Sequence, residues 1–129
     1  MNHNLHDYEI DSVVLDGDRI IFSFPDGFRV TDDGREMMMG KLVFIIDRTC
    51  CSDAPLDSFL FIRRHLPLGW RDISFRQFAA LFKKGNMLIH DEYDSKMTNW
   101  KMIQLNANTR WSNIELFITD IEKIEYWER

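Results

Sequence analysis

The sequence predicts a strand-dominated α+β fold, a mostly antiparallel curved sheet or partial barrel with one helix packed on it. Along most of the chain, runs rich in β-branched and aromatic residues alternate with short turns that contain Gly, Asp or Pro. Only residues 75–84 repeat their apolar side chains with helical spacing. Because every parallel connection needs a crossover, usually a helix, we expect about seven or eight strands to pair largely antiparallel.

The chain is expected to fold as one domain, residues 1–129. Its ten Phe, four Trp and three Tyr supply enough apolar surface for a single packed core.

A β-hairpin is predicted at the start of the chain. Asp16-Gly17-Asp18 separates two apolar runs, residues 8–15 and 19–24, and Gly accepts the positive φ that such a turn requires. Pro25-Asp26-Gly27 predicts a second turn before a strand that begins at Phe28. The rest of the first half is predicted as a polar loop at 31–35, strands at 41–47 and 58–64, and a connection at 67–70.

The helix is predicted from Phe75 to Lys84. Ser74 and Gln77 have the spacing of a capping box, in which each side chain bonds a free backbone N–H of the first turn. Gly85 is expected to end the helix in the left-handed conformation. The apolar stripe that would face the sheet consists of Phe75, Phe78, Ala79 and Phe82.

The last third is predicted to return to strands. Alternating or apolar runs place them at 87–90, 100–105, 111–119 and 121–127, although Ile121 and Ile124 could also share one helical turn. The turn-rich link at 106–110 is expected to close a hairpin.

Charge and hydropathy exclude several classes of protein. Sixteen Lys and Arg against 21 Asp and Glu give a formal charge of −5, which argues against binding to nucleic acid. The longest apolar runs are far too short to span a membrane, and no secretory signal precedes the first strand. A cytoplasmic protein without a membrane partner is therefore expected.

Cys50 and Cys51 are the only cysteines. Adjacent residues do not easily reach disulfide geometry, so two reduced thiols are favoured over a redox or soft-metal pair.

No catalytic, cofactor or metal constellation is recognisable, and a non-enzyme without a cofactor is expected. His90-Asp91-Glu92 is the closest approach to a metal site, with His90 and Glu92 able to share one face of a strand. His6-Asp7 lacks a nucleophile at any known spacing. A strand end and a strand flank explain these residues as well.

Aromatic and methionine side chains remain as candidates for contact with a partner or ligand. Trp70 follows a Pro-Leu-Gly loop and Trp127 lies near the end of the chain, so both are expected on the surface. Met38 belongs to a Met-Met-Met run whose soft side chains adapt to a partner. Trp100 and Trp111 lie in alternating strands and are expected in the core.

Leu5-His6-Asp7-Tyr8-Glu9-Ile10, the Asp-Gly hairpin after it and the strand Ile114–Ile118 resemble a group of small uncharacterised bacterial proteins. Some of these look like immunity proteins of bacterial toxin systems, which bind and occlude a toxin. The resemblance covers the two ends of the chain and carries over no functional residue.

Two hypotheses of function follow. The first is a non-catalytic protein-binding domain, with an immunity-type inhibitor as one form of it, whose acidic surface steers a basic partner. The alternative is a small-ligand or carbohydrate-binding β-domain that uses Trp70 and Trp127 as stacking surfaces.

Overall fold

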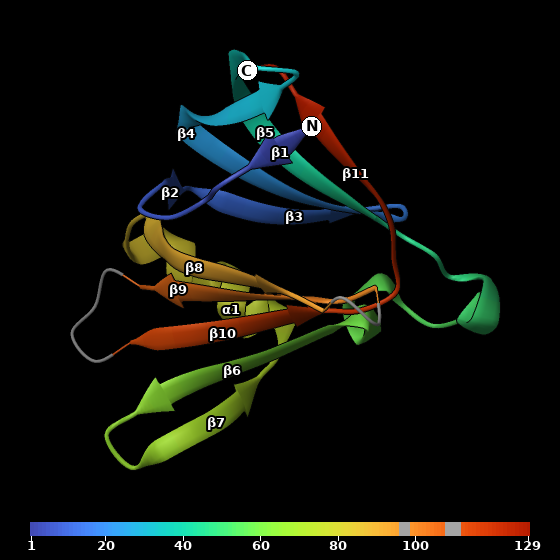
Figure 1. The fold of residues 1–129 in the computed structure, drawn as a ribbon. Coiled ribbons are helices and arrows are strands. Elements are labelled where there is room, and N and C mark those ends of the chain that lie inside the picture. The colour runs from blue at the N-terminus through green and yellow to red at the C-terminus, as the bar shows by residue number, and fades with distance from the viewer. Residues whose placement is uncertain (96–98, 108–111) are drawn as a thin grey trace.

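The computed structural model describes residues 1–95, 99–107 and 112–129, and it confirms the α+β class. Within these residues every strand pairing is antiparallel, and the strands form two sheets that lie face to face (Figure 1). One core cluster draws on both sheets, as a single domain requires. No helix of the described chain is long and apolar enough to cross a membrane.

Sheet A has the order β1-β4-β5-β11, with β3 beside β1 on the same edge of β4. Its strands are β1 (Asn2–His3), β3 (Ser12–Asp16), β4 (Arg19–Asp32), β5 (Arg35–Ile46) and β11 (Ile121–Trp127).

Sheet B has the order β2-β8-β9-β10-β6-β7. Its strands are β2 (Glu9–Ile10), β6 (Leu60–Leu66), β7 (Gly69–Ile73), β8 (Met87–Asp94), β9 (Lys101–Asn106) and β10 (Asn113–Ile118).

The predicted hairpin is present, but the run that precedes its turn divides between the sheets. Glu9 and Ile10 pair with β8 of sheet B, whereas residues from Ser12 onward pair with β4 of sheet A. The change of sheet at Asp11 lets Ile10 and Val13 both bury their side chains between the layers.

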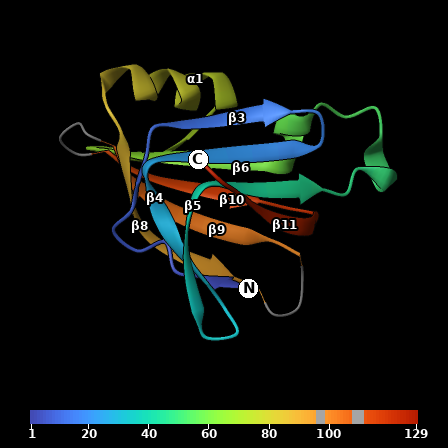
Figure 2. The same cartoon turned by 90° about the horizontal axis from the view of Figure 1, so that it is seen from above.

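Strand β4 runs through the predicted turn at Pro25–Gly27. Ser23 pairs with Lys41 and Phe28 with Met39, so four residues of β4 stand opposite Gly40 alone. The φ of Gly27 is +76°, as a turn would require, yet the chain keeps its direction and the sheet bends (Figure 2).

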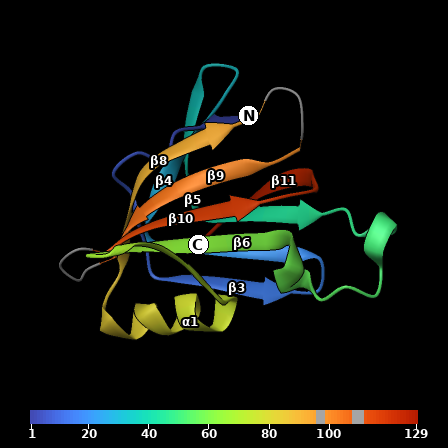
Figure 3. The same ribbon diagram turned by 90° about the horizontal axis from the view of Figure 1, so that it is seen from below.

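Helix α1 (Phe75–Ala80) continues into a 3₁₀ turn, Leu81–Lys84, over the range predicted for one helix. The Ser74 hydroxyl accepts from the Gln77 N–H at 3.1 Å, and the Gln77 side chain accepts from the Ser74 N–H at 2.9 Å, which confirms the capping box. Phe78 is fully buried and anchors the helix beside β3 and β6 (Figures 2 and 3). Gly85 has a positive φ of 139° but an extended ψ, so it is not left-handed helical.

Two further 3₁₀ turns, Thr49–Cys51 and Leu56–Phe59, connect β5 to β6. The predicted connection at 67–70 is instead the turn of a β6–β7 hairpin, because Gly69–Ile73 pairs with Leu66–Ile62. Of the predicted link at 106–110, only residues 106 and 107 lie within the described part of the chain.

The core consists of interlocking aromatic and aliphatic side chains from both sheets. Phe22 and Phe44 meet edge to face with ring centroids 5.6 Å apart, and Phe24 packs on Phe28 at 4.3 Å. Such pairs add to the free energy gained by removing their apolar area from water.

Candidate functional site

The outer face of sheet B is left uncovered by the helix (Figure 3). Core residues alternate with outward residues along each strand, as the pleat requires. In β9, Ile103 and Leu105 are buried, whereas Met102, Gln104 and Asn106 are partly exposed on the other face.

Strand register sorts the outward side chains into cross-strand rows of different chemistry. The first, which we call the apolar row, consists of Phe61, Phe117, Met102 and Tyr93. The second, the charged row, consists of Asp72, Arg63, Glu115, Gln104 and Asp91. The third, the amide pair, consists of Asn113 and Asn106.

The apolar row presents large side chains to solvent. Phe61 is 51% exposed and Tyr93 is 45% exposed, and the Phe61 and Phe117 ring centroids lie 6.1 Å apart. Trp100 extends the row, since its ring lies 6.3 Å from that of Phe117. Trp100 is therefore half-buried on the outer face, and its predicted place in the core is wrong.

The charged row contains an ion pair in which the carboxylate is nearly buried and the guanidinium is partly exposed. Arg63 donates through Nη2 to Glu115 Oε1 at 2.8 Å, and its guanidinium carbon lies 4.6 Å from the Trp70 ring centroid. The Arg63 charge is thus shared between a carboxylate and an aromatic face. The charge of Asp91 is the main cause that raises the pKa of Tyr93, with desolvation and the charge of Glu115 adding to it.

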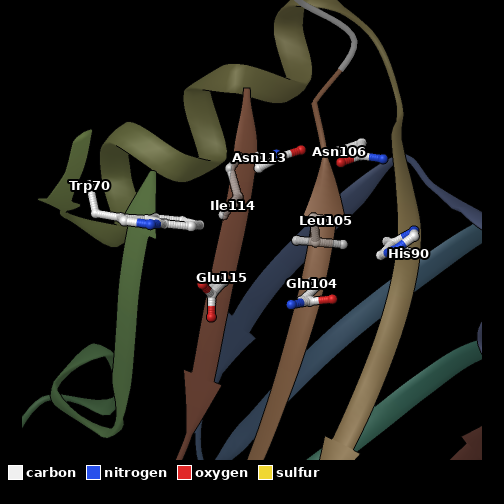
Figure 4. A pocket seen from close by; sticks show the side chains of 8 residues that line it. All are labelled: Trp70, His90, Gln104, Leu105, Asn106, Asn113, Ile114 and Glu115. Carbon is white, nitrogen blue, oxygen red and sulfur yellow. The ribbon is translucent and has the colours of Figure 1, made fainter. Parts of the chain in front are cut away.

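A hollow of about 390 Å³ lies between the charged row and the amide pair (Figure 4). Leu105 of β9 and Ile114 of β10 form its floor. The side chains of these two residues are buried in the core on the other face of the sheet. Trp70 stands at one end and His90 at the other. The polar side chains along its two sides are Gln104 and Glu115, and Asn106 and Asn113.

A second polar cluster lies inside the sandwich, between sheets A and B. Glu92 accepts from His3 Nε2 at 3.0 Å and from Lys101 Nζ at 3.2 Å. Lys101 also pairs with Asp94 at 3.0 Å, and the Tyr126 hydroxyl lies 2.6 Å from His3 Nδ1. The His3, Lys101 and Glu92 side chains are only 5%, 11% and 13% exposed.

The cluster has the connectivity of a catalytic relay, with a carboxylate, an imidazole and a hydroxyl in sequence. Desolvation, followed by the charge of Glu92, raises the pKa of Tyr126, so the hydroxyl stays protonated at neutral pH. Neither effect activates it as a nucleophile. The cluster instead joins β1 and β11 of sheet A to β8 and β9 of sheet B.

The His90 and Glu92 side chains lie on opposite faces of β8 and do not share the one face that the sequence allows. The pairing of β8 with β9 shifts register between Ile89 and Asp91, which marks a β-bulge. As a result His90 borders the hollow on the outer face, whereas Glu92 enters the internal cluster. Within the described residues no three His, Cys, Asp or Glu side chains are arranged to hold a metal ion.

His6 and Asp7 are both exposed, with His6 Nε2 3.3 Å from Asp7 Oδ2. The His6 ring also lies 5.9 Å from the His90 ring, close to the carbonyl oxygen of that residue. Cys50 and Cys51 are free thiols exposed in a 3₁₀ turn, and interaction with Cys51 raises the pKa of Cys50.

Of the three residues predicted to contact a partner, Trp70 lies on sheet B, whereas Trp127 and Met38 lie on the paired strands β11 and β5 of sheet A. Trp70 borders the hollow and is 43% exposed, in accord with its predicted surface position. Trp127 is half-buried on β11, 5.5 Å from the Arg19 guanidinium carbon. Met38 is 55% exposed on β5, and Trp111 lies outside the described residues.

Sequence reasoning missed most of the side chains that make these two sites. In the sequence, the outward positions of β9 and β10 are recognisable only as polar residues that alternate with apolar ones, as for Gln104, Asn113 and Glu115. Any strand with one face in water has this pattern, so it does not mark a site. His3 and Tyr126 are separated by 123 positions, so no local pattern links them.

Searches of protein-family models, curated proteins and solved structures found no match to this chain.

Proposed function

We propose that this chain is a protein-binding domain and that the apolar row of sheet B is the centre of its interface. The observation that carries the proposal is the clustering of large side chains on one uncovered face. Phe61, Tyr93 and Trp70 are each more than two-fifths exposed, and all lie on the outer side of sheet B. Aromatic side chains of this kind, with Arg, supply most of the binding free energy at protein interfaces.

The charge beside the row favours a basic partner. Asp72, Asp91 and Glu115 in the charged row outnumber the single cation Arg63. The whole chain carries −5, so its field attracts a cationic protein over a longer range. An immunity-type inhibitor that occludes a basic toxin is one form of this function, and it agrees with the resemblance at the two ends of the chain.

The test is site-specific photocrosslinking in the native host. A photoreactive phenylalanine analogue replaces Phe61 in one tagged protein and Val14 in another. Val14 is a matched control, because it is 48% exposed but belongs to β3 of sheet A. We expect one basic protein to be crosslinked from position 61 in stoichiometric yield and not from position 14.

A second pair of variants measures the contribution of the row. Phe61→Ser should abolish copurification of that protein, since a central aromatic anchor is worth about 2 kcal/mol or more. Val14→Ser should leave copurification unchanged. Equal crosslinking from both positions, or copurification that survives Phe61→Ser, contradicts an interface on the apolar row.

A further inference from the structure

The amide side chains around the hollow on sheet B have no partner within the described part of the fold. The amides of Gln104, Asn106 and Asn113 make no hydrogen bond with any other described residue. Gln104 and Asn106 are nevertheless half-buried at the hollow. Asn113 is exposed, and all three amides border the hollow, so their donors and acceptors are free to bond a ligand in place of water.

The hollow offers one aromatic face and several groups that can both donate and accept. Each amide presents a carbonyl oxygen and an NH₂ group, and Glu115 presents carboxylate oxygens. Trp70 supplies the part of its indole surface that Arg63 does not cover, while Leu105 and Ile114 turn their side chains into the core. An apolar ligand would therefore find little apolar area besides Trp70.

We propose that this hollow binds a saccharide. A sugar ring has one face of C–H groups, which would pack on the indole of Trp70, and a rim of hydroxyls that both donate and accept. Those hydroxyls would bond to Gln104, Asn106, Asn113 and Glu115. The volume of about 390 Å³ falls within the range of small-ligand sites and admits a saccharide of one or two rings.

The charge of the lining argues against an anionic ligand. Glu115 is the one acidic side chain among the eight lining residues, and none of the eight is Lys or Arg. The nearest cation, Arg63, is already paired with Glu115 at 2.8 Å and stacked on Trp70. A phosphate or carboxylate ligand would find no Lys or Arg among the lining residues to pair with, so a neutral saccharide is favoured.

This site goes beyond the proposed protein interface and does not depend on it. The apolar row and the hollow lie on different rows of sheet B, although the interface around the apolar row also draws on Trp70 and Glu115.

The experiment is a titration of the purified chain with a panel of neutral mono- and disaccharides. Hexoses, N-acetylhexosamines and their β- and α-linked disaccharides serve as probes, and binding is followed by isothermal calorimetry and ¹⁵N chemical shifts. We expect at least one probe to bind at micromolar to millimolar concentration. Its shift changes should centre on the side-chain amides of Gln104, Asn106 and Asn113.

Variants then test the assignment. Trp70→Ala and Asn113→Ala should each weaken binding by about tenfold, the effect of one well-placed contact. Val14→Ser, on the other sheet, should leave the affinity unchanged. Circular dichroism and thermal melts of each variant separate loss of binding from loss of folding.

Three results would overturn the proposal. They are no binding by any probe up to high millimolar concentration, shift changes that centre away from the hollow, and full affinity in folded Trp70→Ala and Asn113→Ala.

Conservative Asn113→Asp keeps the size of the side chain but removes its donors, and it should also weaken binding.

Discussion

The internal polar cluster should make a large, measurable contribution to stability, and Glu92 is the residue that tests it. Replacing Glu92 with Leu removes the acceptor of both His3 Nε2 and Lys101 Nζ, whose side chains are only 5% and 11% exposed. A buried donor that loses its acceptor costs about 1–3 kcal/mol. Lys101 keeps its ion pair with Asp94, so we expect a total loss of about 2–4 kcal/mol.

Urea denaturation measures the free energy of unfolding of the wild type and of Glu92→Leu. At this chain length each kcal/mol corresponds to about 3 °C in Tm, so the variant should melt roughly 6–12 °C lower. Glu36→Leu is the matched control, because Glu36 forms an exposed pair with Arg29 at 3.6 Å. Its loss should change the free energy by no more than about 0.5 kcal/mol.

A double-mutant cycle isolates the interaction between Glu92 and Lys101. Lys101→Met alone removes the cation but leaves the carboxylate bonded to His3. The double variant should be more stable than the sum of the two losses predicts, by about 1–2 kcal/mol. Each single substitution leaves the charge of the other residue with one partner fewer, and the second substitution removes that charge. Additive effects, or a loss below about 1 kcal/mol for Glu92→Leu, would refute the reasoning.

Three further predictions concern other parts of the fold. The raised pKa of Tyr126 means that the folded state favours the protonated hydroxyl. The stability that this preference contributes is fully present below the unfolded pKa of about 10, and it is lost as the pH rises through the folded pKa. Tyr126→Phe should therefore flatten the decline of stability above about pH 10 in urea titrations, and an unchanged decline would contradict this. Phe78→Ala empties a fully buried site, so its unfolding free energy should fall by about 3–5 kcal/mol, whereas a loss below about 1 kcal/mol would place Phe78 outside the core. A Cβ on Gly40 would lie 2.4 Å from Arg129 Cγ and 2.7 Å from its Cα, so Gly40→Ala should free the C-terminal residue and speed its removal by carboxypeptidase B; an unchanged rate would show that the contact is absent.

The elements that the sequence predicts well are those whose local signals agree with one another. The helix has a capping box at Ser74 and an apolar stripe around Phe78, and both are present in the structure. The strand at 121–127 is also confirmed with its predicted bounds. In these segments local hydrogen bonding and burial favour the same conformation.

The elements that the sequence does not predict depend on distant partners. Strand β7 reads Gly-Trp-Arg-Asp-Ile, without alternation, and it forms because β6 supplies a complete antiparallel partner. The two-residue strands β1 and β2 are too short for any periodic pattern. At Pro25–Gly27 the local turn chemistry is correct, but pairing with β5 on both sides turns it into a bulge.

The same distinction holds for the candidate sites. Trp70 could be placed on the surface from its Pro-Leu-Gly context, a local signal. The hollow beside it requires that Asn113 face Asn106 and that Glu115 face Gln104, which depends on the register of β9 and β10. The alternating burial of β9 and β10 decides which side chains point outward, but it does not decide which outward residues of the two strands face each other.

The order of outward side chains on β9 and β10 supports the two binding surfaces proposed for the outer face of sheet B. Along β9 it runs Met102, Gln104, Asn106, and along β10 it runs in the opposite sense, Asn113, Glu115, Phe117. Antiparallel register therefore sets apolar beside apolar and amide beside amide.

A solvated outer face requires only polar residues in any order, and an exposed apolar row is a liability for solubility. Each cross-strand pair in these rows contributes about 0.2–1 kcal/mol to folding, less than a large side chain in the core. A surface on which apolar, charged and amide side chains lie in separate zones is suited to bind partners or ligands of more than one chemical kind. The apolar row and the hollow are therefore the two places where substitutions should change binding while leaving the fold intact.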